Sequence, residues 1–421
     1  MKHIVILVGN YYPNFSAVGT CARNIVDELR LKANISIISL MTSSNDTEHV
    51  NFECCDVYRI STHSRNNYFR YKEQHKISSG IKKIIYNILF NMIRSFGYLR
   101  AIFQNVNVNW GLVKAYNDKV EELEKKRHID TIVCFCFPFE TLVAGQRFKY
   151  SKPLIKSNFH PAKLIFIMFD RFSSSSSLHR TKWNAKLKKK KHKKIEANIF
   201  SHADIIMYID SLKDDLVQNG YSFKGTPCLI EHPLLKPIKY TDLVRYNNQK
   251  INIIFTGSLN KDVRNPKYVF AVFSEILMEN KDINMHFYTH ADISDLSVFS
   301  TRFPGQVFSH GSVSSDIAHS AIMNGDFLLS IGNNDIGQFP SKIFEYISAL
   351  KPIIHFAKYI DDPVNAILSK YKNSIVLIEN DINIECLRGF LFNKNQNSIE
   401  FEELECIFPE ALPKNIAELI I

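Results

Sequence analysis

The sequence has no long uninterrupted hydrophobic run. Of its 421 residues 45% are hydrophobic, yet no stretch reaches the roughly 18–20 apolar residues that cross a bilayer. The apolar run from Ile4 to Val8 is too short for the core of a secretory signal peptide, and Asn10 and Asn14 follow at once. We therefore expect a cytoplasmic protein without a membrane-spanning helix.

Metal-binding and disulfide patterns are missing as well. Eight cysteines are present, but none forms a C-x-x-C pair and no run of cysteine and histidine has zinc-finger spacing. Cys134 and Cys136 lie two apart in a predicted strand, so they share one face, and we interpret them as packing residues. No Asp-x-Asp motif follows a predicted strand. We expect reduced thiols, no metal site and no cofactor.

No acidic residue occurs between Lys76 and Arg100. Apolar residues recur there at helical spacing with Lys and Arg between them, and a second basic segment, "RTKWNAKLKKKKHKKIE", covers 180–196. Basic amphipathic helices bind anionic bilayer surfaces. The structural alternative is a core-facing helix and then a solvated helix face. Both interpretations stay open, and segments 76–103 and 180–196 are our candidates for peripheral contact with the inner face of the cell membrane.

The chain length indicates the number of domains, and the net charge indicates the kind of partner. A chain of this length suits two ordinary domains better than one core. Charged residues make up 22% of the sequence and the net charge is +10 with histidine neutral. The basic excess favours an anionic partner, which can be a nucleotide phosphate, a nucleic acid or an acidic membrane surface.

The first half of the chain alternates strand-like and helix-like segments. Ile4–Val8 is a β-branched run typical of a buried parallel strand, a loop and a helical pattern ending near Leu29 follow, and "NISIISL" is the next strand. Further strands are expected in 130–137, 164–169 and 203–209. This order predicts a doubly wound α/β domain over 1–235.

The second half repeats the plan without repeating the sequence. A polar stretch at 236–250 predicts an interdomain linker. Strands expected in "INIIFTG", "INMHFYT", "GQVFSHG", "DFLLSIG" and "KPIIHF" then alternate with helices, which predicts a second α/β domain over 236–400. We expect 401–421 to form helices that pack back on the body.

The stretch "GQFPSKIFEYISALKPII" (337–354) predicts an anion site at the start of a helix. Ile343, Phe344, Ile347 and Leu350 give this helix a buried stripe, and proline or serine suits its first turn or its cap. Free N–H groups at such an end attract phosphate, and Lys342 adds a full charge. Glu345, about one turn on, is placed to accept hydrogen bonds from a ribose diol. The alternative is a capped surface helix whose charges face solvent.

Two other loops are expected at the same edge of the second sheet. "FTGSLNKDVRNP" (255–266) ends a strand with Gly257 and Ser258 and then carries Arg264, whose forked donors suit phosphate oxygens. "SHGSV" (309–313) ends the next strand, and Gly311 and Val313 suit a nucleotide base. All three loops follow predicted strands, which brings them to one edge.

Two acidic residues of the first half also follow predicted strands. Asp170, next to Arg171, comes after the strand at 164–169, and Glu140 comes after "FCFPF". Both are candidates for orienting an acceptor substrate, and loop salt bridges are the alternative.

These motifs resemble those of retaining glycosyltransferases of family 4, of the bacterial surface-polysaccharide type. The matching pieces are "FTGSL" with Arg264 and Pro266, "SHGSV" and "PSKIFEYISALKPII"; "YYPNFSAVGT" and "SHADIIMYIDSLKDDL" match less sharply. The resemblance implies the GT-B fold, in which two Rossmann-like doubly wound domains face a central cleft. It implies that the second domain binds a nucleotide-diphosphate sugar and that the first domain binds the acceptor.

The resemblance also implies roles for individual residues. The diphosphate would contact Arg264, Ser341 and Lys342 beside Pro340, the ribose Glu345, and the base Gly311 and Val313, while Gly19 would admit the phosphates from the first domain. The family's motif places a Glu, seven residues and a second Glu, but Gly337 stands at the first position. Asp335, Gln338 or the backbone N–H groups of "NNDIGQ" (333–338) are the available substitutes for its contact with the transferred sugar.

The sequence therefore predicts a hexosyltransferase-type enzyme. It would move a sugar from a nucleotide sugar to a glycan or lipid-linked acceptor in capsule, lipopolysaccharide or exopolysaccharide biosynthesis, without metal and with retention of configuration. A sugar-nucleotide epimerase of related fold is a near alternative. A catalytically inactive sugar-nucleotide-binding subunit and a basic nucleic-acid-binding protein are the others, although no aromatic-interleaved RNA motif supports the last.

Overall fold

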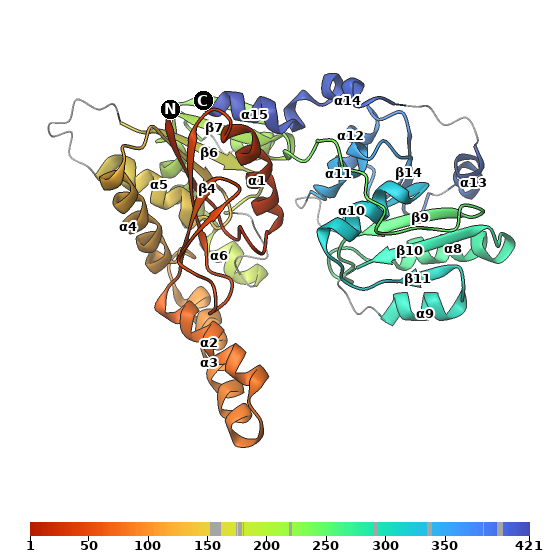
Figure 1. Ribbon diagram of the computed structural model, residues 1–421, viewed down its shortest axis with the longest axis horizontal. Helices are drawn as coiled ribbons and strands as arrows, with labels where there is room; N and C mark the ends of the chain where they lie inside the picture. Colours follow the sequence, from red (N-terminus) through yellow and green to blue (C-terminus); the bar gives the residue numbers. More distant parts are fainter. Residues whose placement is uncertain are drawn as a thin grey trace. The chain divides into compact units, whose positions relative to one another are not determined.

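The computed structural model describes residues 1–151, 161–173, 175, 179, 181–218, 221–289, 294–334, 339–381, 383–393 and 399–421. The chain forms two compact units (Figure 1). The first comprises Met1–Pro233 and Pro413–Ile421, and the second comprises Leu234–Leu412.

The first unit is built on an eight-stranded sheet in the order β3-β4-β2-β1-β5-β6-β7-β8. Its strands are β1 (His3–Leu7), β2 (Asn34–Leu40), β3 (His49–Phe52), β4 (Cys55–Ile60), β5 (Thr131–Phe135), β6 (Lys163–Met168), β7 (Ile205–Ile209) and β8 (Thr226–Ile230). Neighbouring strands are parallel except for the pair β3 and β4. Every residue of the central strand β1 is buried, as the β-branched run predicts for a strand covered on both faces.

Helices lie on both faces of this sheet (Figure 1). The described helices of the first unit are α1 (Ala17–Leu29), α2 (His63–Ile77), α3 (Gly80–Phe103), α4 (Trp110–Lys126), α5 (Glu140–Ser151), α6 (Lys182–Phe200), α7 (Asp210–Gln218) and α15 (Pro413–Ile420). Helix α15, from the end of the chain, packs against α1.

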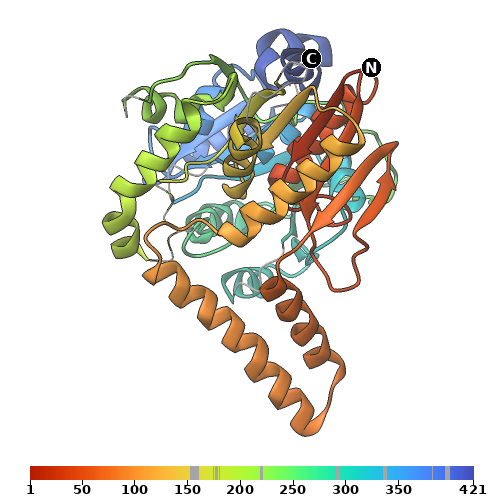
Figure 2. The same ribbon diagram turned by 90° about the vertical axis from the view of Figure 1, so that its left-hand side faces the viewer.

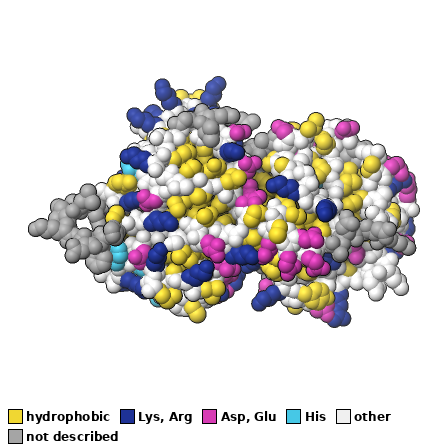
Figure 3. All heavy atoms as spheres, turned by 90° about the horizontal axis from the view of Figure 1, so that it is seen from above, with side chains coloured by type: hydrophobic (Ala, Val, Ile, Leu, Met, Phe, Trp, Pro, Cys, Tyr) yellow, Lys and Arg dark blue, Asp and Glu magenta, His cyan; other side chains and the backbone are white. Residues whose placement is uncertain are grey.

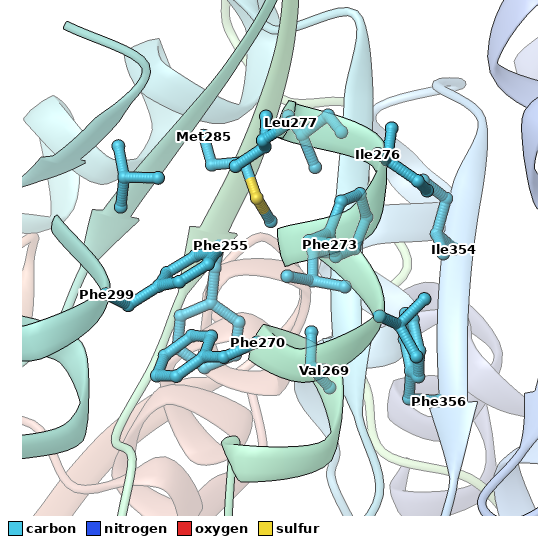
Figure 4. Close-up of a cluster of buried hydrophobic side chains, with 14 of the residues drawn as sticks. Phe255, Val269, Phe270, Phe273, Ile276, Leu277, Met285, Phe299, Ile354 and Phe356 are labelled. Carbon is cyan, nitrogen blue, oxygen red and sulfur yellow. The ribbon is translucent and has the colours of Figure 1, made fainter. Parts of the chain in front are cut away.

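The second unit holds a six-stranded, all-parallel sheet in the order β11-β10-β9-β12-β13-β14. Its strands are β9 (Ile251–Thr256), β10 (Ile283–Tyr288), β11 (Val307–Ser309), β12 (Phe327–Ile331), β13 (Ile353–Ala357) and β14 (Ser374–Ile378). Its helices are α8 (Lys267–Glu279), α9 (Ser294–Arg302), α10 (Ser315–Asn324), α11 (Lys342–Ser348), α12 (Pro363–Leu368), α13 (Ile384–Phe392), α14 (Phe401–Ile407) and the 3-10 turn η1 (Pro409–Ala411). Phenylalanines of α8 and β9, among them Phe255, Phe270 and Phe273, form the core on one face of this sheet (Figure 4).

The strand order fixes where a ligand is expected. Numbered within its unit, the second sheet runs 3-2-1-4-5-6, the classical dinucleotide-binding order, and the direction of winding reverses between β9 and β12. Folds of this kind bind ligands beyond the carboxyl ends of the strands at that reversal. The segments that follow β9 and β12 are therefore the first place to look for a site.

The predicted fold class of two doubly wound α/β units is confirmed, and every strand predicted by its residue range is present. The segment 236–250, predicted as an interdomain linker, is part of the second unit, within the predicted bounds 236–400. The hydroxyl of Ser320 on α10 accepts the backbone N–H groups of Leu243 and Val244 at 3.1 and 3.0 Å. The terminal segment predicted at 401–421 is also divided, since 401–412 stays with the second unit and Pro413–Ile421 returns to the first.

Helices α2 and α3 form an antiparallel hairpin that extends from the first unit (Figure 2). The helix predicted over 76–103 is present as α3 from Gly80 onward, while 76 and 77 end α2. The core-facing alternative is wrong because neither α2 nor α3 contains a buried residue. Among the described helices, none has the length and apolar character to cross a membrane.

Candidate nucleotide site in the second unit

The end of strand β9 is the centre of the candidate site. Thr256 is buried, and its backbone N–H donates to the hydroxyl of Tyr346 at 2.8 Å. Gly257 follows with φ 149°, a backbone conformation that other residues rarely adopt. A Cβ at Gly257 would lie 3.4 Å from Nη1 of Arg264, so the guanidinium sits directly over this turn.

Arg264 is held by its own loop and by the end of β12. Its backbone N–H donates to the carbonyl of Asn260 at 2.7 Å, and its Nε donates to Oδ1 of Asn333 at 3.1 Å. Burial lowers the pKa of the Arg264 guanidinium, and nearby Tyr346 and Asp362 oppose that shift. The side chain is thus a preorganised, partly desolvated cation, and such groups bind phosphate more strongly than freely solvated ones.

Helix α11 is fastened to the same strand end. Nζ of Lys342 donates to Oγ1 of Thr256 at 3.1 Å, and the Tyr346 hydroxyl also lies 3.2 Å from that oxygen. Ile343, Phe344 and Ile347 form the buried stripe, as predicted. Leu350 does not belong to it, because the helix ends at Ser348 and Leu350 follows with φ 59°.

Glu345 faces two cationic or ionisable groups. Its Oε2 lies 3.9 Å from Nζ of Lys342 and 3.9 Å from Nε2 of His319 on helix α10. Burial lowers the pKa of His319, and the Glu345 carboxylate partly opposes that shift. A carboxylate therefore lies one turn inside the helix, within reach of the groups that would hold an anion.

The beginning of α11 differs from the prediction. Ser341 occupies the N-cap position, but its backbone is already helical (φ −55°, ψ −21°) and its side chain makes no cap hydrogen bond. The carbonyl of the buried Pro340 accepts the N–H of Ile343 at 3.1 Å. The expected serine cap is therefore absent, because Ser341 continues the turn that Pro340 begins.

The two loops expected nearby lie at the same edge of the sheet. Ser258 is exposed directly after Gly257. Gly311 follows β11 with φ 70° and open space around its Cα, and the half-buried Val313 comes just before Ser314, which caps α10. Because α10 also carries His319, the loop predicted for the base leads into the helix that reaches Glu345.

Asp335 and Gln338 lie outside the described residues, as does Gly337. The predicted side-chain contacts with the transferred sugar therefore lie outside the described residues.

In the first unit, local packing requires a glycine at position 19. A Cβ at Gly19 would lie 2.1 Å from the carbonyl oxygen of Asn10, and its N–H donates to Oγ of Ser16 at 3.1 Å. The glycine is thus required where the loop folds onto the first turn of α1, and its N–H is already used by the cap.

The two acidic candidates of the first unit occupy different environments. Glu140 begins α5, and its Oε1 accepts the backbone N–H of Asn109 at 2.7 Å. Burial raises the pKa of the Glu140 carboxyl. Asp170 is exposed at the end of β6, and the neighbouring Arg171 donates to the carbonyl of Ser211 at 2.9 Å. Among the described residues neither carboxylate forms an ion pair, and the charge of His232 acts on Asp170.

Sequence reasoning missed Thr256, Asn333, Tyr346 and His319. Asn333 accepts from Arg264, Thr256 accepts from Lys342 and contacts Tyr346, and His319 faces Glu345. Thr256 stands in the quoted "FTGSL", but its contact with α11 joins residues 86 apart in the sequence. No spacing pattern reveals such a long-range contact. In the described part of the chain, no group of three His, Cys, Asp or Glu residues is arranged to hold a metal ion.

Neither a protein-family model nor a curated protein sequence matches the chain. Several solved structures, however, are similar to the chain. An α,α-trehalose-phosphate synthase (UDP-forming) from Burkholderia xenovorans, in complex with glucose-6-phosphate, is 10% identical with a TM-score of 0.63, over 100% of this chain and 98% of that chain.

Two further neighbours are similar over comparable lengths. The catalytic domain of starch synthase IV from Arabidopsis thaliana, bound to ADP and acarbose, is 10% identical with a TM-score of 0.55, over 97% of this chain and 99% of that chain. A UDP-GlcNAc 2-epimerase from Methanocaldococcus jannaschii is 10% identical with a TM-score of 0.54, over 100% and 99%. At this identity the likeness concerns architecture, and it shows that the chain has the GT-B fold.

Proposed function

We propose that this protein is a glycosyltransferase that moves a sugar from a nucleotide-diphosphate sugar to a glycan or lipid-linked acceptor in surface polysaccharide biosynthesis. The observation that carries the proposal is the cluster of Arg264, Lys342 and Glu345 around the end of β9, next to the reversal of the strand order. Two cations and a carboxylate at that point suit a diphosphate joined to a ribose.

The neighbours support the nucleotide part of the proposal. One is a UDP-forming synthase and another is bound to ADP, so the fold accommodates nucleoside diphosphates in those proteins. In this chain Gly311 and Val313 are the proposed neighbours of the base, and Gly257, Ser258, Pro340 and Ser341 of the phosphates. Asp335, Gln338 or the backbone around them would contact the transferred sugar.

The chemistry assigned to these residues is stabilisation of a leaving group. The bond between the anomeric carbon and the phosphate oxygen breaks, and the acceptor oxygen forms the new bond on the same face. The acceptor proton passes to the departing diphosphate. Arg264 and Lys342 stabilise the charge that develops there, and fixed cations do this without a metal ion. Glu345 orients the ribose.

The proposed acceptor side is the first unit. Asp170 is exposed at the carboxyl end of β6 and is the better placed of the two acidic candidates to meet a hydroxyl. Glu140 already accepts a backbone N–H, so we assign it a positioning role there. The enzyme would work at the cytoplasmic face of the membrane.

A transfer assay tests the proposal. The full chain is incubated with radiolabelled nucleotide sugars and a lipid-linked or oligosaccharide acceptor, with and without a chelator. We expect transfer that the chelator does not reduce, and a loss of at least about 100-fold in kcat/KM for Arg264→Ala and Glu345→Ala. Lys261→Ala is the matched control, because Lys261 lies exposed in the same loop and pairs with Asp295.

The alternatives give different results in the same experiment. Interconversion of two sugar nucleotides without an acceptor would identify an epimerase, which the epimerase neighbour makes the second candidate. Nucleotide-sugar binding without turnover would identify an inactive subunit. Salt-dependent binding of nucleic acid without nucleotide-sugar binding would contradict the proposal altogether.

A further inference from the structure

Within the hairpin, one apolar face of α3 packs against α2. Tyr71 lies 6.2 Å from Tyr86, and Phe90 lies 6.2 Å from Tyr68 and 5.5 Å from His75, measured between ring centroids. These contacts join the two helices. The neighbouring face of α3 contains no buried residue.

That second face is an apolar stripe along the whole helix. It consists of Ile81, Ile85, Ile88, Met92, Phe96, Leu99 and Phe103, which are between 48% and 81% exposed. At 3.6 residues per turn these positions fall within about 80° of the helix circumference. We name this set the α3 stripe. Contiguous apolar surface of this kind marks a binding surface, unlike single exposed apolar residues.

Cations surround the stripe. Helices α2 and α3 together carry eight Lys or Arg residues and one Glu. That carboxylate, of Glu73, accepts hydrogen bonds from the hydroxyl of Ser43 and from the backbone N–H of Ser44, both at 3.1 Å. No described carboxylate forms an ion pair with any Lys or Arg of the two helices, including Lys82, Lys83 and Arg94 near or along the stripe.

The first turns of helix α6 are fastened to the end of α3 by hydrogen bonds. The carbonyl of Ala101 accepts hydrogen bonds from Nδ2 of Asn184 at 3.0 Å and from Nζ of Lys188 at 2.6 Å. These bonds fix the first turns of α6 beside the end of α3 (Figure 2). Trp183 and Leu187, one turn apart on α6, are 65% and 63% exposed among further exposed lysines.

We propose that the α3 stripe, continued by Trp183 and Leu187, docks on an anionic lipid bilayer surface. The apolar side chains would enter the headgroup boundary, and the unpaired cations would meet the lipid phosphates. A second copy of the chain suits the surface less well, because pairing two stripes would bring sixteen unpaired or solvated cations together against two carboxylates. This deepens the proposed function by naming the surface that holds the enzyme at its lipid.

Vesicle binding tests the proposal without any sugar, so it can fail independently of the proposed activity. The full chain is sedimented with sucrose-loaded vesicles of pure phosphatidylcholine or of phosphatidylcholine with phosphatidylglycerol. We expect binding only to the anionic vesicles, with weaker binding at high salt. The triple variant Ile88→Ser/Met92→Ser/Phe96→Ser should reduce the partition coefficient at least tenfold, and Lys82→Gln/Lys83→Gln about 25-fold.

Matched variants separate the stripe from general surface effects. Leu31→Ser/Val298→Ser/Ile360→Ser removes three side chains that are 68–80% exposed elsewhere, and Lys239→Gln/Lys372→Gln removes two exposed lysines. Both should bind like the wild type. The proposal is overturned if the wild-type chain does not bind anionic vesicles, or if the stripe variant binds as well as its control. It is also overturned if the stripe instead mediates a dimer in sedimentation velocity that excludes vesicles.

A fluorescence measurement tests the part assigned to α6. The chain has two tryptophans, so Trp110→Phe leaves Trp183 as the sole emitter. Its emission should shift to shorter wavelength on phosphatidylglycerol vesicles and stay unchanged on phosphatidylcholine. An unchanged emission in vesicle-bound protein would exclude α6 from the surface and overturn that part of the proposal.

Discussion

Thr256 shows how one residue at a strand end organises the candidate site. Its N–H binds the Tyr346 hydroxyl at 2.8 Å and its Oγ1 binds Nζ of Lys342 at 3.1 Å. The strand end and the first turn of α11 are therefore tied before any ligand arrives. Preorganisation of this kind lowers the cost of binding an anion because the cation is already oriented.

The contact of Gly19 with Asn10 gives a prediction about stability. Gly19→Ala places a Cβ 2.1 Å from a backbone carbonyl oxygen, so we expect roughly 1–3 kcal/mol of destabilisation in denaturant unfolding. Gly97→Ala is the matched control, because a Cβ at Gly97 in α3 meets nothing within 4 Å. That change should stabilise the helix by up to about 1 kcal/mol. Equal effects of the two substitutions would contradict the packing described for Gly19.

The beginnings of helices α1 and α11 differ in the use of their serines. Ser16 caps α1 through Oγ, which accepts the N–H of Gly19 at 3.1 Å, whereas Ser341 makes no such bond. We therefore expect Ser16→Ala to cost about 1 kcal/mol of unfolding free energy and Ser341→Ala less than about 0.5 kcal/mol. Chemical denaturation of both variants checks this. A larger cost at Ser341 would show that its side chain supports the helix after all.

The buried residue His192 on α6 predicts that the free energy of unfolding depends on pH. His192 is fully buried, its Nε2 accepts the N–H of Asn107 at 3.0 Å, and its ring stacks on His179 at 4.3 Å. Burial lowers the pKa of His192 to about 3, and His179 and Lys188 add to that shift. The unfolded chain takes up this proton near pH 6.5. The stabilising effect is therefore complete above pH 6.5 and is lost as the pH falls towards 3.

This dependence is measurable with one variant. Between pH 7 and pH 5, His192 should account for about 2 kcal/mol of lost unfolding free energy. In His192→Gln the amide oxygen can still accept from Asn107, and the loss over the same pH range should be smaller by about that amount. An identical pH profile in the two proteins would contradict the burial of His192.

The elements that sequence reasoning predicted are those whose signal is local. The β-branched runs at β1, β2 and β9 are buried strands because a parallel sheet covers both of their faces. The helical period within 76–103 also predicts a helix, but the period alone does not distinguish a core-facing stripe from an exposed one. The contacts of Thr256 with α11 and of His319 with Glu345 depend on residues far apart in the chain, so no spacing pattern predicts them.

Charge is distributed unevenly over the molecule. Helices α2, α3 and α6 together carry sixteen Lys or Arg and two Glu residues. Their combined net charge of +14 exceeds the net charge of +10 for the whole chain. On the face shown in Figure 3, basic and acidic side chains are interspersed with hydrophobic ones. The basic excess therefore belongs to one region of the first unit, which suits a local anionic partner better than a nucleic acid bound along the whole chain.

The central claim is that Arg264 and the start of α11 bind the diphosphate of a nucleotide sugar. Thermal unfolding with uridine, guanosine, cytidine and adenosine diphosphate sugars tests it most directly, with wild-type chain, Arg264→Ala and Lys261→Ala. At about 100 times its dissociation constant, one of these donors should stabilise the wild-type chain and Lys261→Ala by about 2.7 kcal/mol, and Arg264→Ala far less. If none of the nucleotide sugars stabilises the wild-type chain, or if Arg264→Ala responds as the wild type does, the claim is contradicted.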